Sequence, residues 1–211
     1  MTTAALGSAG AWTQIPASPA AAAAGKPLIL VLGDSLSAEY GLKRGEGWVP
    51  LLEKRLAQQK IAATVVNASI SGDTSSGGRS RFAALLAQHK PSLVVVELGA
   101  NDALRGLPLA STEDNLLQIT KAAQAAGAKV LIVGIQVPPN YGGDYTRRFG
   151  AVFSQVASST RSALVPFLLK GVADAPDALS LFQADRIHPT AVAQPQLLDN
   201  VWPELRKLLP K

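Results

Sequence analysis

The sequence predicts an α/β fold: a three-layer α/β/α sandwich on a five-stranded parallel sheet, flavodoxin-like in outline. The first observation is that, from residue 27 onward, short apolar runs alternate with amphipathic stretches, which is typical of a parallel sheet covered by helices. The second is that 211 residues, 47% of them hydrophobic, suffice for one complete core. Because parallel strands are joined by right-handed crossovers, we expect helices on both faces of the sheet.

Five apolar runs are the expected strands. They cover residues 28–32, 64–68, 93–98, 130–135 and, with a weaker pattern, 164–168. Short runs rich in Leu, Val and Ile are typical of strands that are buried on both faces.

The segments between these runs carry apolar residues at helical spacing. Such stripes occur at residues 48–56, before the second strand, and at residues 82–86, before the third. The remaining expected helices cover residues 115–126, 145–163 and 191–209. Gly127 is a suitable C-terminal stop for the first of these three. No linker divides the body, so residues 27–211 are expected to form one domain.

Composition excludes several classes of function. The chain has 20 basic and 15 acidic residues, a net charge of +5, but the basic residues are scattered along the sequence, so nucleic-acid binding is not expected. The absence of cysteine removes disulfides, thiolate metal sites and cysteine nucleophiles. Two histidines make a poor ligand set, and we expect no metal and no cofactor. No apolar run approaches the roughly 18 residues of a membrane span, so stable membrane insertion is not expected.

Residues 1–26 differ from the rest of the chain. Ala, Gly, Ser, Thr and Pro dominate them, and no Lys or Arg precedes Lys26. A secretory signal would have a basic region before its apolar stretch, yet the alanine-rich approach to Gly25 resembles the remnant of an export sequence. We therefore expect a flexible N-terminal segment and a periplasmic or secreted protein. A disordered tail or expression-derived end on a cytoplasmic protein is the alternative.

Ser35 and His188 are the candidate catalytic pair. Ser35 directly follows the first apolar run, and His188 lies in a loop three residues after Asp185. A serine nucleophile needs a histidine base and a third group that orients the histidine, which makes Asp185 the preferred carboxylate. The same loop contains Asp174 and Asp177 as rivals. The other histidine, His89, ends a helical stretch, where a cation is favoured by the helix dipole.

Four segments with polar residues follow expected strands, and the carboxyl ends of parallel strands meet at one edge of a sheet. Ser35 follows the first strand, Gly72 the second, Asn101 the third and His188 the fifth. The backbone N–H groups of Ser35 and Gly72 and the side-chain amide of Asn101 can stabilise a carbonyl oxygen that becomes negative during acyl transfer. Taken singly, Gly72 can simply open a turn, and Asn101 can cap a helix.

The four blocks together resemble the SGNH (GDSL) hydrolase superfamily. Within it the chain is similar to the bacterial acyl-CoA thioesterase I, protease I and lysophospholipase L1 group and to related arylesterases. The matching blocks are residues 32–41, 67–75, 96–106 and 185–189. Ala100 stands where many relatives have glycine. The chain lacks the Gly-x-Ser-x-Gly elbow of α/β-hydrolases, because Ser37 occupies its last position, so we expect a less strained turn and a more open site.

The resemblance implies a serine esterase. Its catalytic residues would be Ser35, Asp185 and His188, and its oxyanion donors Ser35, Gly72 and Asn101. Acyl esters, acyl-CoA thioesters or lysophospholipids are the implied small-molecule or lipid-like substrates, and we expect a monomer. The apolar rim that we expect to hold the acyl chain consists of Leu104, Leu107, Pro108, Leu109 and Ile187, with a second wall at residues 138–143. The alternatives are a carbohydrate O-acetylesterase of the same fold and a non-catalytic flavodoxin-like binding module.

Overall fold

The structure, a computed structural model, describes Met1 and residues 26–210 and has a five-stranded sheet of order β2-β1-β3-β4-β5. All four neighbouring pairs are parallel. The strands are β1 (Leu28–Gly33), β2 (Thr64–Asn67), β3 (Leu93–Glu97), β4 (Lys129–Val133) and β5 (Ala163–Val165). The predicted fold class is therefore confirmed. The expected flexible segment falls on residues 2–25, which lie outside the described residues.

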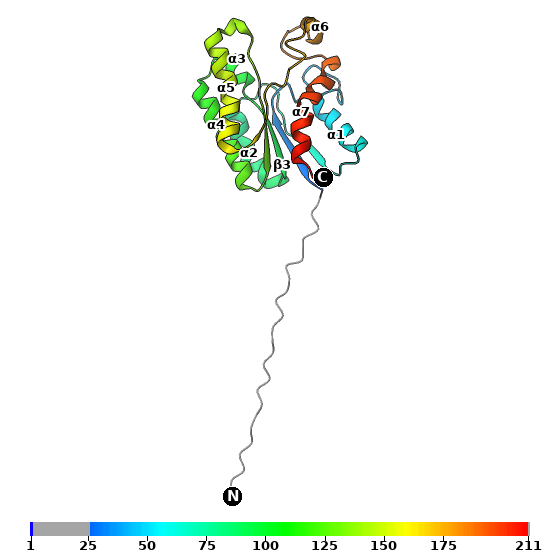
Figure 1. Ribbon diagram of the computed structural model, residues 1–211, viewed down its shortest axis with the longest axis vertical. Helices are drawn as coiled ribbons and strands as arrows, with labels where there is room; N and C mark the ends of the chain where they lie inside the picture. The colour runs from blue at the N-terminus through cyan, green and yellow to red at the C-terminus, as the bar shows by residue number, and fades with distance from the viewer. Residues whose placement is uncertain (2–25, 211) are drawn as a thin grey trace.

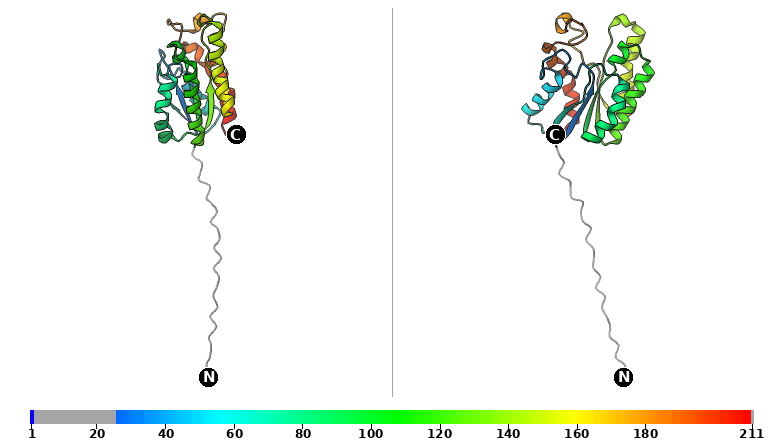
Figure 2. Two further views of the ribbon diagram at one scale, coloured as in Figure 1. Left: turned by 90° about the vertical axis from the view of Figure 1, so that its left-hand side faces the viewer. Right: turned by 180° about the vertical axis from the view of Figure 1, so that it is seen from behind.

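Helices cover both faces of the sheet (Figures 1 and 2). Helices α1 and α7 pack together on one face, whereas α2, α4 and α5 form the layer on the other. The helices are α1 (Trp48–Gln58), α2 (Ser75–His89), α3 (Ala100–Leu104), α4 (Leu109–Ala125), α5 (Gly143–Thr160), α6 (Ala178–Leu181) and α7 (Gln194–Leu208), with short 3₁₀ turns η1 (Pro139–Tyr141) and η2 (Ala191–Ala193). None of the helices in the described part of the chain is long and apolar enough to cross a bilayer.

The central strands form the core of the molecule. The side chains of residues 29–32 in β1 and 93–97 in β3 are buried, as expected for strands covered by helices on both faces. Leu30 lies beside Val66 on one side and Val94 on the other. This buried sheet provides a rigid support for the loops at its carboxyl edge.

Two predicted elements end three residues earlier than expected. The last strand stops at Val165 because Pro166 has no N–H to donate to the sheet. Helix α5 stops at Thr160 because Arg161 turns into the left-handed conformation (φ 54°), and β5 begins two residues later.

Helix α2 begins at Ser75, seven residues before the predicted stripe. Thr74 caps it: its side-chain oxygen accepts a hydrogen bond from the N–H of Gly77 at 3.2 Å. Gly78 fits this position because a Cβ there would overlap a methyl carbon of Leu98. The low helix propensity of this segment is therefore offset by capping and by close packing on the residue that follows β3. Similarly, α4 begins at Leu109 rather than at residue 115.

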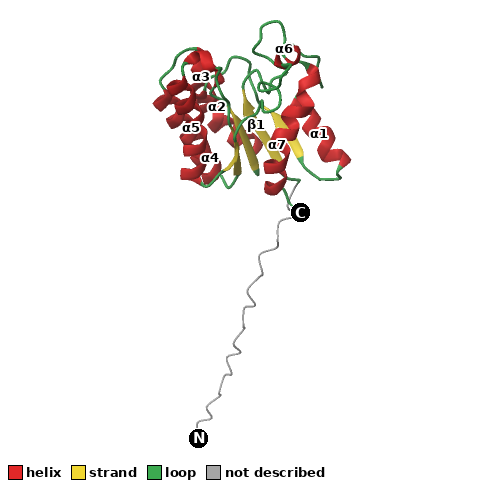
Figure 3. Cartoon of the chain, turned by 45° about the horizontal axis from the view of Figure 1, so that its top comes forward, coloured by secondary structure: helices red, strands yellow, loops and turns green. Residues whose placement is uncertain are grey.

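The loops that follow the strands and the first and last residues of the described body lie at opposite ends of the sheet. Loops that follow the strands gather at one end together with α3 and α6, as Figure 3 shows. β1 begins and α7 ends at the opposite end (Figure 1). The segments predicted to carry the site therefore share one edge.

Candidate active site

Ser35 lies in a tight turn directly after β1. The carbonyl of Asp34 accepts the N–H groups of Ser37 and Ala38 at 3.2 and 3.0 Å, and the Asp34 side chain accepts the N–H of Leu36 at 3.0 Å. Ser35 is not among the described residues with a positive φ, as expected for a turn less strained than a nucleophile elbow. The turn leaves Ser35 half-buried at the carboxyl edge of the central strand.

The side chains of Ser35, His188 and Asp185 form a continuous hydrogen-bonded chain. His188 Nε2 lies 2.8 Å from Ser35 Oγ, and His188 Nδ1 lies 2.7 Å from Asp185 Oδ2. These residues come from the first and last loops of the fold, 153 positions apart. The distances match those required for a base that takes a proton from a serine and is oriented by a carboxylate.

Asp185 is stabilised as a carboxylate. Partial burial acts to raise its pKa, but hydrogen bonds from the His188 side chain and from the N–H groups of His188 and Ile187 outweigh it and lower the pKa from 3.8 to about 2. The rival carboxylates make other contacts, Asp174 with the N–H of Gly171 and Asp177 with Ser180. His89 ends α2 at the opposite edge of the sheet.

A buried carboxyl group, Glu97, lies behind the serine turn. Its Oε2 accepts a 2.7 Å hydrogen bond from Ser37 Oγ and a longer one, 3.4 Å, from the N–H of Asp34. Position 33 favours glycine because there is no space for a side chain: a Cβ would lie 2.9 Å from Glu97 Oε2 and from Ser37. The φ of Gly33 does not require glycine. Burial raises the pKa of Glu97 well above its ordinary value, and repulsion from Asp34 adds to the effect.

Asp34 connects the serine turn with the third loop. It is fully buried, and burial is the main cause that raises its pKa from 3.8 to about 7, with the charges of Asp73 and Asp102 adding to the effect. Its Oδ2 accepts a 3.0 Å hydrogen bond from the amide nitrogen of Asn101, which also donates to the carbonyl of Asp73 at 2.9 Å. The Asn101 amide is thus held between the loops that follow β1 and β2.

The other two predicted oxyanion donors are backbone groups. The N–H groups of Ser35 and Gly72 donate to no acceptor within residues 26–210. Gly72 has a φ of +80°, which glycine adopts without strain, and Arg105 Nη2 donates to its carbonyl at 2.7 Å. The structure brings Ser35, Gly72 and Asn101 to one sheet edge and leaves two free N–H groups there.

A buried carboxylate next to Asn101 fixes α3 in place. Asp102 accepts hydrogen bonds from the N–H and the hydroxyl of Ser75, at the start of α2, and from Thr112 Oγ1 in α4. It is 2% exposed. Three helices are therefore joined through one side chain, which restricts the position of the adjacent Asn101.

Tyr40 and Gln183 were not predicted from the sequence as site residues. The Tyr40 ring lies over the His188 imidazole, with centroids 4.3 Å apart and planes 38° apart. Gln183 joins the serine and histidine segments: its Nε2 donates to the carbonyls of Tyr40 at 2.9 Å and Pro189 at 3.1 Å, and its N–H donates to the carbonyl of His188 at 2.8 Å. Glu97 was also missed, although a lone carboxyl group in an otherwise apolar strand is a visible signal.

The predicted apolar rim is partly exposed. Leu104 and Ile187 are 47% and 46% exposed, whereas Leu109, the first residue of α4, packs partly against the core. Large apolar side chains are also exposed in the loops and short helices that follow each strand. Those exposed in the described body are Tyr40, Ile70, Leu104, Tyr141, Leu179, Ile187 and Val192, and every one follows the carboxyl end of a strand.

The described part of the chain contains no group of three or more His, Cys, Asp or Glu side chains arranged to hold a metal ion. The groups that the structure places together at this edge are a serine, a histidine, a carboxylate and hydrogen-bond donors.

The chain is similar to proteins of known family over most of its length. Residues 31–194 match the model of the GDSL-like Lipase/Acylhydrolase family. The chain is 54% identical over 181 residues to the esterase TesA of Pseudomonas aeruginosa, covering 86% of this chain and 89% of the relative. It is 41% identical over 187 residues to thioesterase 1/protease 1/lysophospholipase L1 of Escherichia coli, covering 89% and 87%. The crystal structure of TesA superposes with a TM-score of 0.83 at 54% identity, covering 86% of this chain and 99% of that one.

Proposed function

Because the chain belongs to the GDSL-like lipase/acylhydrolase family and is an ester hydrolase, we propose that it acts through an acyl-enzyme formed on Ser35. The observation that carries this proposal is the hydrogen-bonded chain from Ser35 Oγ through His188 to Asp185, with distances of 2.8 and 2.7 Å. Family membership also rules out the alternative of a non-catalytic binding module.

In the first half of the reaction, Ser35 Oγ bonds to the carbonyl carbon of the ester while His188 Nε2 takes the hydroxyl proton. Collapse of the tetrahedral intermediate breaks the bond to the alcohol or thiol, which receives that proton from Nε2. In the second half, Nε2 deprotonates a water whose oxygen bonds to the carbonyl carbon of the acyl-serine. The bond between that carbon and Ser35 Oγ then breaks, the carboxylic acid leaves, and Ser35 Oγ takes the proton back from Nε2. Asp185 accepts a hydrogen bond from Nδ1 throughout and stays ionised, since its pKa is about 2.

Three groups are proposed to stabilise the negative oxygen of the intermediate. The N–H groups of Ser35 and Gly72 are available because they bond to no described acceptor. The Asn101 amide already donates to the Asp34 side chain and to the Asp73 carbonyl. It therefore acts as the third oxyanion donor by sharing one of these hydrogens with the substrate oxygen. Each such donor contributes about 3 to 4 kcal/mol where it acts.

The proposed substrate is an ester or thioester with an apolar acyl chain. Exposed Leu104 and Ile187 favour a hydrocarbon over a sugar, with Leu107, Pro108 and Leu109 completing the proposed wall. The relatives named esterase and thioesterase 1/lysophospholipase L1 support this class. An acetylated carbohydrate is the competing substrate. A monomer exported to the periplasm or outside the cell, with residues 1–26 derived from an export signal, is part of the same proposal.

Labelling by a fluorophosphonate tests the nucleophile. The wild-type chain should be labelled and Ser35→Ala should not, while Ser154→Ala, which removes an exposed hydroxyl in α5, should behave like the wild type. Ester turnover by Ser35→Ala should fall by at least about a thousandfold with an unchanged melting temperature. Retained labelling or turnover would exclude the mechanism.

A substrate series tests the acyl preference. Rates on p-nitrophenyl esters of increasing chain length, an acyl-CoA and a lysophospholipid should rise with acyl length beyond acetyl. A preference for acetyl groups on a xylooligosaccharide would instead support the carbohydrate O-acetylesterase.

A further inference from the structure

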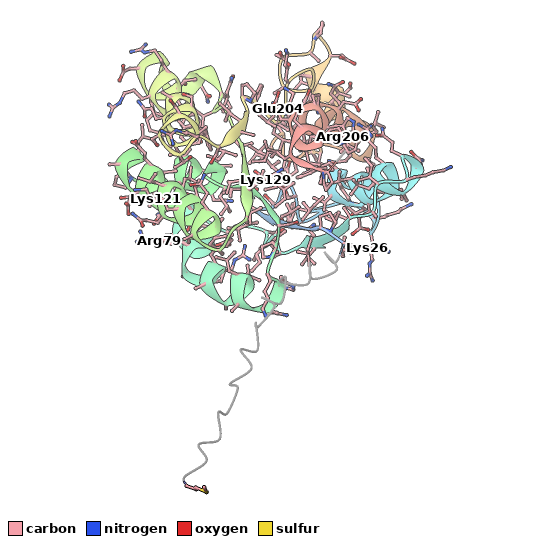
Figure 4. All side chains as sticks on the ribbon, turned by 60° about the horizontal axis from the view of Figure 1, so that its bottom comes forward. Lys26, Arg79, Lys121, Lys129, Glu204 and Arg206 are labelled. Atoms are coloured by element: carbon pink, nitrogen blue, oxygen red, sulfur yellow. The ribbon has the colours of Figure 1, made fainter. Side chains whose placement is uncertain are left out.

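Positive charge is concentrated at the edge of the sheet opposite the site. Seven cationic residues that lie there, here called the basic edge, are Lys26, Lys60, Lys90, Lys129, Arg161, Arg206 and Lys207. Figure 4 shows Lys26, Lys129 and Arg206 at this end, with Glu204 of α7 beside Arg206. No Asp or Glu occurs in the described loops at this end or in the last turn of any helix that leads into them.

The basic edge is poorly neutralised within the molecule. Lys207, bonded to Glu204 at 2.7 Å, is the only one of the seven in an ion pair with a described carboxylate. The site edge, by contrast, carries both signs of charge. Its acidic residues are Asp34, Glu39, Glu46, Asp73, Asp102, Asp144, Asp174, Asp177 and Asp185, and its cations are Lys43, Arg44, Arg105, Arg147, Arg148, Lys170 and Arg186. Residues that are scattered in the sequence thus leave an excess of positive charge at the basic edge, whereas the charges at the site edge nearly balance.

Three of these cations occupy backbone conformations that glycine adopts more easily. Lys60, Lys90 and Arg161 have φ values of 56°, 46° and 54° where α1, α2 and α5 end. Gly127 has the equivalent place after α4, with a φ of 84°. Helix dipoles favour cations at these ends, but they do not require them in the left-handed position. The chain therefore keeps a cation at three places where glycine would relieve backbone strain.

We propose that the basic edge docks the enzyme on a membrane surface that carries anionic phospholipid head groups. Such a surface attracts clustered Lys and Arg through unpaired charge alone, with no need for a pocket or a matched groove. Five of the seven residues are lysines, whose compact charge suits this diffuse attraction better than the bidentate recognition of single phosphates.

Two other polyanions fit the basic edge less well. The interface with an acidic protein would have apolar anchors, and single-stranded nucleic acid would stack on aromatic rings. The exposed large hydrophobic residues of the described body all lie at the site edge, in the loops and short helices that follow the strands, and the basic edge has none. The partner that needs only charge is the lipid surface.

Docking in this orientation leaves the site facing away from the bilayer. Ser35 lies at the carboxyl end of β1, and Lys26 precedes the other end of the same strand. The docked enzyme would therefore act on esters that reach it from the aqueous side. This consequence rests on the proposed function, whereas the docking itself does not.

Cosedimentation with vesicles tests the proposal. The full chain should bind vesicles of phosphatidylglycerol mixed with phosphatidylcholine, and should not bind pure phosphatidylcholine. Binding should fall steeply between about 0.1 M and about 1 M salt, because exposed charges are screened. Replacing Lys60, Lys90 and Arg161 together by Gly should reduce the partition coefficient by about fivefold for each cation, or about a hundredfold in all.

The triple variant is designed to stay folded. Glycine relieves the left-handed positions, so its melting temperature and its hydrolysis of a water-soluble short ester should match the wild type. A second triple variant with Asn, which also tolerates this conformation, controls for glycine flexibility. The matched charge control is Lys43→Gln, Arg44→Gln and Arg147→Gln at the site edge, which should still bind the anionic vesicles.

Three outcomes would overturn the proposal. They are equal binding to both vesicle types, equal loss of binding in the site-edge control, and binding of a DNA duplex without binding of anionic vesicles. Because ester turnover is measured on the same samples, a failure of docking is distinguishable from a failure of the proposed catalysis.

Discussion

Replacing Gln183 by Ala should slow catalysis without weakening substrate binding. The Gln183 amide donates two hydrogen bonds, to the carbonyl of Tyr40 in the serine segment and to that of Pro189 in the histidine segment. At about 1 kcal/mol each, their loss removes about 2 kcal/mol from the contact between the two segments. If that stabilisation is needed to hold His188 against Ser35 in the transition state, kcat falls about thirtyfold.

Steady-state kinetics on a short p-nitrophenyl ester would measure this effect. KM should stay near the wild-type value, because Gln183 positions the base and is not part of the proposed acyl rim. Labelling by a fluorophosphonate should slow by a similar factor. Gln183→Met, which keeps the length of the side chain but has no donor, should resemble Gln183→Ala.

Gln124 offers a matched control. Its amide also donates two hydrogen bonds, to the carbonyl of Thr160 at 2.8 Å and to Ser162 Oγ at 3.2 Å, but at the opposite edge of the sheet. Gln124→Ala should lower the melting temperature by a comparable amount and leave kcat unchanged. If Gln183→Ala loses only stability, or if Gln183→Met restores kcat, the reasoning about positioning is refuted.

Three further predictions concern the support beneath the serine turn. Because the pKa of Asp34 is raised from 3.8 to about 7, its contribution to stability is present below pH 3.8 and is lost as the pH rises through about 7, a difference of about 4 kcal/mol. Asp34→Asn should therefore flatten the dependence of the unfolding free energy on pH between these values, and an unchanged slope would refute this prediction. Glu97→Gln should cost under about 1 kcal/mol in urea unfolding, because its amide oxygen can still accept the Ser37 hydrogen bond. Glu97→Ala leaves Ser37 Oγ without its acceptor and should cost about 2 to 4 kcal/mol; equal costs would contradict the contribution of that hydrogen bond. Gly33→Ala should cost about 1 to 3 kcal/mol and lower kcat, because the new Cβ displaces the turn that carries Ser35; wild-type values for both would show that the turn has room to spare.

The elements that sequence reasoning located best are those with strong local signals. The central strands are continuous apolar runs, and Gly127 stops α4 at the predicted place with a φ of 84°. The start of α2 was missed because its first residues have low helix propensity. What offsets that propensity is the Thr74 cap and the packing of Gly78 against Leu98, and the second of these depends on the folded sheet.

In the candidate site, too, some features have a local sequence signal and others depend on the folded structure. Ser35, Gly72, Asn101 and His188 each follow a strand, so topology alone places them at one edge. The contacts of Gln183 with Tyr40 and of Glu97 with Ser37 span 143 and 60 residues, and no local pattern marks them. The pKa of Asp34 likewise depends on complete burial, which is a property of the assembled core.

The pairing of Ser35 with His188 bears on how the enzyme is made. Ser35 leaves the ribosome early, yet its proposed base, His188, follows 153 residues later, and Gln194 of α7 accepts the N–H of Trp48 across 146 residues. Under the proposed mechanism, an unfinished polypeptide contains a nucleophile with no base to activate it. Ester cleavage is then expected only after translation has delivered the last loop and helix, and truncated products are expected to be inactive rather than partly active.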